Sequence, residues 1–305
     1  MTQLIKKLMI AVIVSILIGG VVGFQMWKKY QSQSPIQAYG KLVTVGGRKM
    51  NIYQIGKGKQ TLVFIPGQGE PAPKASFTNL AKQLKNKYRL VFVEPFGSGL
   101  SDDTPKPRTS KNIVSEIHEA LQKAGIKKGY FLAGHSIGGI YGLQYVKTYG
   151  SDVKGFIGID SSTPGMEGGG MKVETQQIDL KNLHTIPNVP NAINKEFKAL
   201  AKRNYKTKAV KNEGEQISQN LKNAEGVTFP KDFKSLYLLA QDTYDNMENR
   251  RKYFDIKGNW IEQHEALSAD KGDVKTKVLK GDHLLYLTAY KEMAKEIEDF
   301  ISANK

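Results

Sequence analysis

Residues 130–138 read YFLAGHSIG, and this stretch indicates the fold more strongly than any other part of the sequence. Tyr130–Ala133 is an apolar run that predicts a buried strand, and Ile137–Tyr149 predicts a helix. Between them, Gly134–Gly138 fits the pattern G-x-S-x-G. A serine on a sharp strand-to-helix turn holds its hydroxyl clear of the sheet, and the glycines allow neighbouring backbone to approach. We therefore expect Ser136 to be a nucleophile; a glycine-rich turn with an incidental serine is the alternative.

Strands and helices alternate through much of the chain. The continuous apolar run Thr61–Ile65 predicts a central strand, and further strands are predicted at Tyr88–Val93, Val153–Ile159, Ser235–Ala240 and Val274–Leu279. Helical spacing predicts helices at Ser76–Lys87, Ser110–Ala124 and about Tyr286 to Ile301. Two shorter strands, Lys41–Thr44 and Met50–Gln54, flank Gly46-Gly47, which is a hairpin signal. This order predicts an α/β fold with a mostly parallel central sheet and helices on both faces.

The alternation stops between residues 163 and 232. This stretch is polar, rich in lysine and largely helical in its spacing. We interpret it as a helical cap inserted over the sheet. Residues 35–305 are therefore expected to form one domain that carries this insertion.

The N-terminal segment differs from the rest of the chain. Leu8–Trp27 has 20 residues without a charge and is flanked by Lys6-Lys7 and Lys28-Lys29. As a helix it would be about 30 Å long, which is the thickness of a hydrocarbon core. We expect residues 1–34 to form a single transmembrane anchor and a short stalk, with the catalytic domain outside the membrane. A cleaved signal peptide, giving a secreted protein, is the alternative.

The composition excludes several classes of site. The sequence has no cysteine, so disulfides, thiolate catalysis and cysteine-ligated metals are excluded. It also has no Walker A loop, H-E-x-x-H motif or dinucleotide-binding glycine pattern, and we expect no metal and no cofactor. The formal net charge of +16 is carried by dispersed lysines without a nucleic-acid-binding motif, so no nucleic-acid partner is expected.

A serine hydroxyl needs a base to remove its proton. Among the five histidines, His283 follows the predicted strand Val274–Leu279 and precedes the last helix. The carboxyl ends of parallel strands share one edge of a sheet, so His283 is expected at the same edge as Ser136. His135 neighbours the serine in sequence but should point away from it, as a packing residue.

The base in turn needs a carboxylate that orients its second nitrogen. Asp242 follows the strand Ser235–Ala240 and is our first choice. Asp245, one helical turn further on, is the second choice, and Asp160, directly after Val153–Ile159, is the third.

An oxyanion hole requires two convergent N–H donors. The N–H of Ile137, the residue after the serine, is one candidate. The other is the N–H of Gln68, in the loop after the strand Thr61–Ile65, where Gly67 and Gly69 let the backbone come close. A plain tight turn is the alternative for that loop.

Four motifs together resemble the α/β-hydrolase superfamily, in its cap-bearing lineage of esterases, lipases and peptidases. Ile65–Gly69 resembles the oxyanion loop, Glu94–Asp102 the D-x-x-G-x-G-x-S turn, Gly134–Gly138 the nucleophile turn and Gly281–His283 the base loop. The resemblance covers about residues 40–160 and 233–302. Two departures are that Glu94 replaces the usual Asp and that Ala240–Asp245 lacks the usual glycine of the acid loop.

The resemblance implies a serine hydrolase with the α/β-hydrolase fold that cleaves a small ester, or less readily an amide, through an acyl-enzyme. A proline-type aminopeptidase or a carbon–carbon bond hydrolase would use the same triad. A non-catalytic binding protein on this scaffold is the alternative from another class, and a basic nucleic-acid binder is a third. The sequence does not indicate an oligomeric state.

Overall fold

The computed structural model describes residues 2–33, 35–167, 180, 181 and 183–304. The chain divides into two compact units, Met1–Ala38 and Tyr39–Lys305. The predicted boundary between residues 34 and 35 lies close to this division.

The first unit consists mostly of α1 (Thr2–Gln33), a continuous helix. Among the residues described, no helix combines the length and the apolar character that crossing a bilayer requires. The predicted transmembrane helix at Leu8–Trp27 is therefore not supported. The cellular location of the second unit stays a prediction.

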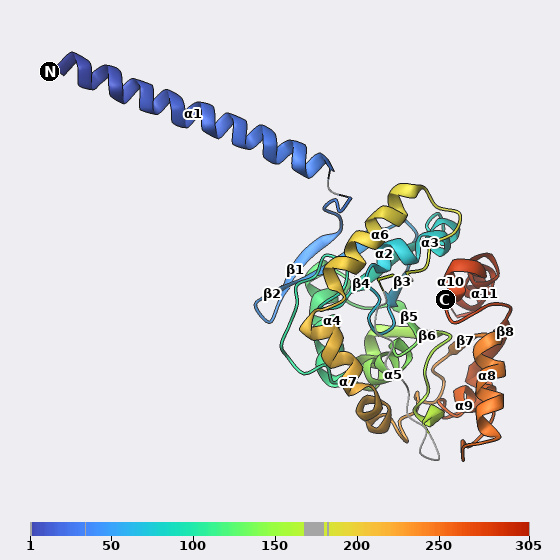
Figure 1. Ribbon diagram of the computed structural model, residues 1–305. Helices are drawn as coiled ribbons and strands as arrows, with labels where there is room; N and C mark the ends of the chain where they lie inside the picture. The colour runs from blue at the N-terminus through green and yellow to red at the C-terminus, as the bar shows by residue number, and fades with distance from the viewer. Residues whose placement is uncertain (1, 34, 168–179, 182, 305) are drawn as a thin grey trace. The chain divides into compact units, whose positions relative to one another are not determined.

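The second unit is built around an eight-stranded sheet (Figure 1). Its strands are β1 (Lys41–Val45), β2 (Arg48–Ile55), β3 (Gln60–Ile65), β4 (Tyr88–Glu94), β5 (Tyr130–His135), β6 (Val153–Ile159), β7 (Ser235–Ala240) and β8 (Val274–Leu279). They lie in the order β1-β2-β4-β3-β5-β6-β7-β8. The pairs β1–β2 and β2–β4 are antiparallel and all the others are parallel. The predicted mostly parallel sheet is confirmed.

The hairpin between the first two strands is also confirmed. Val45 pairs with Arg48, and the two residues between them are Gly46 at φ 53° and Gly47 at φ 79°. Two successive residues with positive φ make a turn whose twist matches that of the strands it joins, and glycine reaches this conformation at little steric cost.

Helices cover both faces of the sheet. The α-helices described in this unit are α2 (Pro73–Ser76), α3 (Thr78–Leu84), α4 (Ser110–Ala124), α5 (Gly138–Tyr149), α6 (Asn191–Asn204), α7 (Lys208–Asn223), α8 (Gln241–Arg251), α9 (Trp260–Glu265), α10 (Leu285–Thr288) and α11 (Tyr290–Ala303). The predicted helix at Ser76–Lys87 is divided between α2 and α3, and the predicted C-terminal helix between α10 and α11.

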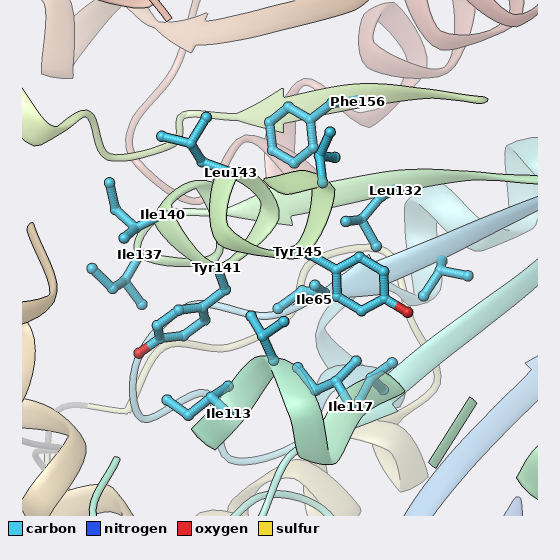
Figure 2. Close-up of a cluster of buried hydrophobic side chains, with 14 of the residues drawn as sticks. Ile65, Ile113, Ile117, Leu132, Ile137, Ile140, Tyr141, Leu143, Tyr145 and Phe156 are labelled. Atoms are coloured by element: carbon cyan, nitrogen blue, oxygen red, sulfur yellow. The ribbon is translucent and has the colours of Figure 1, made fainter. Parts of the chain in front are cut away.

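Strand β5 shows how the two faces are separated. Tyr130 and Leu132 belong to the hydrophobic cluster drawn in Figure 2, in which α4 and α5 pack against the sheet. Phe131 lies between them in sequence and instead contacts Phe300 of α11, with ring centroids 6.0 Å apart. Successive side chains of a strand point to opposite faces, so a strand covered on both sides is apolar throughout. This explains why β5 is a continuous apolar run.

Helices α6 and α7 lie in the stretch between β6 and β7 that we interpret as the insertion. Part of the predicted cap, residues 168–179 and 182, lies outside the described residues. Buried amides join the described part to the rest of the fold. The Asn220 side chain accepts a hydrogen bond from the Ser110 N–H at 2.8 Å and donates to the Arg108 carbonyl at 3.0 Å. Asn204 donates to the carbonyls of Pro71 and Gly99.

Candidate active site

Ser136 lies on the turn between β5 and α5, with φ 55°. Positive φ is uncommon for a residue other than glycine, and such a conformation is typical of functional sites. A Cβ at Gly134 would lie 2.4 Å from the Gly138 carbonyl oxygen, and a Cβ at Gly138 would lie 2.8 Å from the Ile65 carbonyl oxygen. The expectation that both glycines are needed for close backbone packing is therefore confirmed.

The loop after β3 comes close to this serine. A Cβ at Gly67 would lie 2.8 Å from His135 Nδ1 and 3.0 Å from Ser136 Cβ. Gln68 and Ile137 both line the same cavity as Ser136. Within the described part of the chain, the backbone N–H groups of Gln68 and Ile137 have no protein acceptor. Both groups are therefore available as hydrogen-bond donors, as their predicted role in an oxyanion hole requires.

His283 lies in the loop between β8 and α10 and lines the cavity with Ser136. Its Nδ1 is 2.6 Å from Oδ2 of Asp160, the residue that directly follows β6. The Asp160 side chain is fully buried and that of His283 is 38% exposed. The carboxylate thus orients the imidazole from beneath the cavity and leaves its other nitrogen, Nε2, as the one that can exchange protons.

Two further groups hold the Asp160 carboxylate. The backbone N–H of Ala240 donates to Oδ1 at 2.9 Å, and the Thr243 hydroxyl donates to Oδ2 at 2.6 Å. These two hydrogen bonds fix the orientation of the carboxylate beside His283. Thr243 was not singled out from the sequence, because a threonine in a helical stretch carries no signal of this role.

The structure corrects the predicted partner of His283. Asp242 and Asp245 are exposed on α8. Asp242 donates its backbone N–H to the Gly281 carbonyl, and the Asp245 carboxylate accepts a hydrogen bond from Gln241. The third choice, Asp160, takes the position expected for Asp242.

The physical reason lies at the end of β7. Helix α8 begins at Gln241, directly after the last residue of β7. Asp242 is therefore fixed in the first turn of a helix, where its side chain faces solvent. No helix follows directly after Asp160. Its backbone has φ 39°, and its side chain contacts His283. Asp is among the residues that adopt positive φ most readily.

His135 supports the base loop. It is 4% exposed, and its Nε2 donates to the His283 carbonyl oxygen at 3.0 Å. Burial and the nearby His283 lower the pKa of His135 from 6.5 to about 3, so the ring is neutral at physiological pH. The expectation that His135 is a packing residue accounts for its burial and its edge contact with Tyr286, but not for its hydrogen bond to the base loop.

The cavity above these groups has a volume of about 580 Å³. Apolar side chains from the insertion and from α8 and α9 form much of its wall, among them Leu183, Phe197, Ile217, Met247 and Trp260. Small-molecule sites typically have volumes of about 300–1,000 Å³ and are largely apolar, with a few polar groups placed for orientation. Within the described ranges, no group of three histidine or acidic side chains is spaced to hold a metal ion.

The chain belongs to the alpha/beta hydrolase fold family, whose model matches residues 60–246. The uncharacterized protein YbdG of Bacillus subtilis strain 168 is 25% identical over 273 residues, which is 83% of this chain and 82% of that protein. The cis-3-alkyl-4-alkyloxetan-2-one decarboxylase of Shewanella oneidensis is 26% identical over 111 residues, which is 35% of this chain and 34% of that protein.

The same fold is found in solved structures. The crystal structure of a membrane phospholipase A, a bacterial virulence factor, superposes with a TM-score of 0.61 over 99% of both chains. The two sequences are 18% identical, so this likeness shows the fold alone.

Proposed function

We propose that this member of the α/β-hydrolase family is a serine hydrolase that cleaves a small carboxylic ester, or less readily an amide, with Ser136, His283 and Asp160 as its triad. The observation that carries the proposal is the 2.6 Å contact between His283 and a fully buried Asp160, at the floor of a cavity that Ser136 also lines. A nucleophile, a base and an orienting acid are the groups that acyl transfer through a serine requires.

In the proposed reaction, Ser136 Oγ attacks the substrate carbonyl carbon while His283 Nε2 takes the hydroxyl proton. The carbonyl oxygen becomes an oxyanion, which accepts hydrogen bonds from the N–H groups of Gln68 and Ile137. Asp160 stabilises the imidazolium. The tetrahedral intermediate then expels the alcohol, which receives its proton from His283. Water, deprotonated by His283, releases the acid from the acyl-enzyme and restores the Ser136 hydroxyl.

The cavity supports a substrate of small-molecule size. A volume of about 580 Å³ suits a monomeric ester rather than a large folded partner. The apolar side chains of Leu183, Phe197 and Ile217 on the insertion favour an apolar acyl or alcohol group. Contact with such walls contributes about 0.8 kcal/mol of binding free energy for each buried methylene, so activity should rise with chain length until the cavity is full.

Labelling with a fluorophosphonate probe tests the nucleophile. We expect the full chain to be labelled and Ser136→Ala not to be. Ser162→Ala is the matched control, because Ser162 also lines the cavity but does not lie on the strand-to-helix turn; this variant should label like wild type. A wild-type chain that remains unlabelled, or a Ser136→Ala chain that is labelled, contradicts the proposal and favours a non-catalytic binding protein.

Turnover of graded substrates tests the bond that is cleaved. We expect hydrolysis of p-nitrophenyl esters over a series from acetate to laurate, with an optimum within the series. Aminoacyl arylamides and a vinylogous diketone serve as substrates for the peptidase and the carbon–carbon hydrolase, respectively. If the arylamides or the diketone are turned over faster than every ester, the assignment to esters is wrong, although the proposed triad is unaffected.

A further inference from the structure

A buried acidic side chain lies two residues after the candidate oxyanion donor Gln68. Glu70 is 9% exposed, and both of its carboxylate oxygens accept hydrogen bonds from the protein. Oε1 accepts from the Ala72 N–H at 3.0 Å and from the Ser76 hydroxyl at 2.8 Å. Oε2 accepts from the Tyr286 hydroxyl at 3.2 Å. Three donors therefore hold this carboxylate, and none of them belongs to the proposed triad.

The three donors come from two separate parts of the fold. Ala72 is the N-cap of α2, and Ser76 is the last residue of that helix. Tyr286 lies on α10, three residues after His283. It is fully buried, and burial raises the pKa of its hydroxyl, which keeps its proton and donates it. Glu70 thus joins its own turn to α2 on one side and to the segment that follows the base on the other.

The backbone of Glu70 is held as firmly as its side chain. Its N–H donates to the Gly67 carbonyl at 3.3 Å and closes a turn whose first central residue is Gln68. Its carbonyl accepts a hydrogen bond from the Ser98 hydroxyl at 2.5 Å. At the other end of the turn, a Cβ at Gly67 would lie 3.0 Å from Ser136 Cβ. Gln68 is therefore held between the nucleophile and Glu70, and a shift of Glu70 would change the direction of the Gln68 N–H.

We propose that Glu70 is a positioning residue that fixes the Gln68 turn against α2 and α10, and so directs the Gln68 N–H toward the oxyanion that forms at Ser136. This inference rests on the proposed function. Catalytic groups must be held to within about 0.5 Å of their productive geometry, so a loosened turn lowers the rate of the chemical step rather than the binding of the ground state. Because protein donors engage both of its oxygens, Glu70 acts through the turn and not by contact with substrate.

Variants at position 70 test this role on the ester that wild type cleaves best. Glu70→Leu removes both acceptor oxygens. We expect its kcat to fall about tenfold with KM within about twofold, which is less than the loss on deleting an oxyanion donor outright. Glu70→Gln keeps one oxygen that can accept from Ala72 and Ser76, and its amide can donate to the Tyr286 hydroxyl. Its kcat should stay within about threefold of wild type.

A milder substitution keeps the test decisive if Glu70→Leu does not fold. Ser76→Ala removes one donor to Oε1 and leaves the carboxylate in place, and we expect kcat to fall about threefold with KM unchanged. Ser115→Ala is the matched control, because the Ser115 hydroxyl also donates one hydrogen bond, to the Asn112 carbonyl of its own helix, α4. Its kinetics should equal those of wild type. Equal kcat values for Ser76→Ala and Ser115→Ala contradict the proposal.

A boronic acid that mimics the tetrahedral intermediate gives a second readout. Its affinity should fall in parallel with kcat across Glu70→Leu and Ser76→Ala, while the affinity of an uncleaved ether analogue of the substrate stays constant. Active sites are counted by fluorophosphonate titration. A merely structural role would lower the number of active sites or the midpoint of thermal unfolding, but it would leave the kcat of each labelled site and the boronate affinity unchanged.

The outcomes separate this inference from the proposed function. A wild-type chain that is neither labelled by fluorophosphonate nor active on esters removes the proposed function, and this inference with it. An active wild type with folded Glu70→Leu at unchanged kcat overturns the positioning role alone. A raised KM at unchanged kcat also overturns it, because Glu70 would then contribute to ground-state binding. A Glu70→Gln variant as slow as Glu70→Leu overturns it too, because the charge of Glu70 would then be responsible.

Discussion

His283 Nδ1 lies 2.6 Å from Oδ2 of Asp160, although 123 positions separate the two residues in the sequence. The carboxylate comes from the end of β6 and the imidazole from the loop after β8, and β7 lies between these two strands in the sheet. The imidazole and the carboxylate therefore meet across the end of an intervening strand. Ala240, the last residue of that strand, donates its N–H to the carboxylate.

Substitution of the carboxylate distinguishes Asp160 from the acids on α8. Asp160→Asn leaves the size of the side chain unchanged but removes the charge that stabilises the imidazolium. We expect kcat for ester hydrolysis to fall about 10³- to 10⁴-fold. Asp242→Asn and Asp245→Asn are the controls, and both should stay within about twofold of wild type, as exposed substitutions usually do. A larger loss in Asp242→Asn than in Asp160→Asn would restore the original sequence-based assignment.

Thr243 should contribute to activity through Asp160. Its hydroxyl donates at 2.6 Å to the same oxygen, Oδ2, that contacts His283. For Thr243→Val, which removes this donor at constant shape, we expect kcat/KM to fall about tenfold, because a hydrogen bond to a charged group contributes about 1.5–3 kcal/mol. Thr243→Ser keeps the hydroxyl and should recover most of the activity. Equal activity of the valine and serine variants would show that the hydroxyl has no role.

The buried His135 should make stability depend on pH. Its pKa is lowered from 6.5 in the unfolded chain to about 3 in the folded one, so the unfolded chain binds more protons between these values. The neutral, buried ring contributes fully to the free energy of unfolding above pH 6.5. This contribution is lost as pH falls, and the loss amounts to about 2 kcal/mol at about pH 5. Urea unfolding of wild type at about pH 7.5 and at about pH 5 measures this loss.

His135→Gln tests the source of that dependence, because its amide can still donate to the His283 carbonyl but does not titrate. The variant should lose less stability than wild type between about pH 7.5 and pH 5. Some dependence should remain, since burial also lowers the pKa of His264. An unchanged dependence in His135→Gln would show that other groups cause it.

The glycines of the nucleophile turn should differ from other glycines in their tolerance of a side chain. For Gly134→Ala, whose Cβ would lie 2.4 Å from the Gly138 carbonyl oxygen, we expect a loss of about 2 kcal/mol or more in the free energy of unfolding. Gly150→Ala is the control: its φ is −57° and its nearest neighbour is 3.6 Å away. It should be neutral or stabilising by up to about 1 kcal/mol. Equal stabilities of the two variants would contradict the steric argument.

Much of the second unit was predictable because its elements carry strong local signals. The strands Val153–Ile159, Ser235–Ala240 and Val274–Leu279 and the helix Ser110–Ala124 begin and end at the predicted residues. Ser235–Ala240 is buried along its whole length, so its ends coincide with the ends of an apolar run, whereas Val274–Leu279 at the edge of the sheet alternates between exposed and partly buried residues. The helix Ser110–Ala124 is bounded by Thr109 at its N-cap and Gly125 at its C-cap.

Helix α8 is the element that the local sequence pattern did not reveal, and it decides where the side chains of Asp242 and Thr243 point. Residues 241–251 are almost entirely polar, and only Met247 is buried. Without an apolar stripe, the stretch has no helical periodicity that would show which of its side chains face the sheet. The actual helix turns Asp242 to solvent and Thr243 toward Asp160. The choice of Asp242 as the partner of His283 was therefore wrong because the local pattern did not show which way its side chain points.

The sequence by itself determined the order of strands and helices, the strand-to-helix turn that carries Ser136 and the loop that carries His283. These features depend on neighbouring residues, on apolar runs and on glycine spacing, which a sequence displays directly. Only the tertiary structure decided which carboxylate meets His283. Several parallel strands end at the same edge of the sheet, so many acidic side chains lie within plausible reach, and only their positions in space select one.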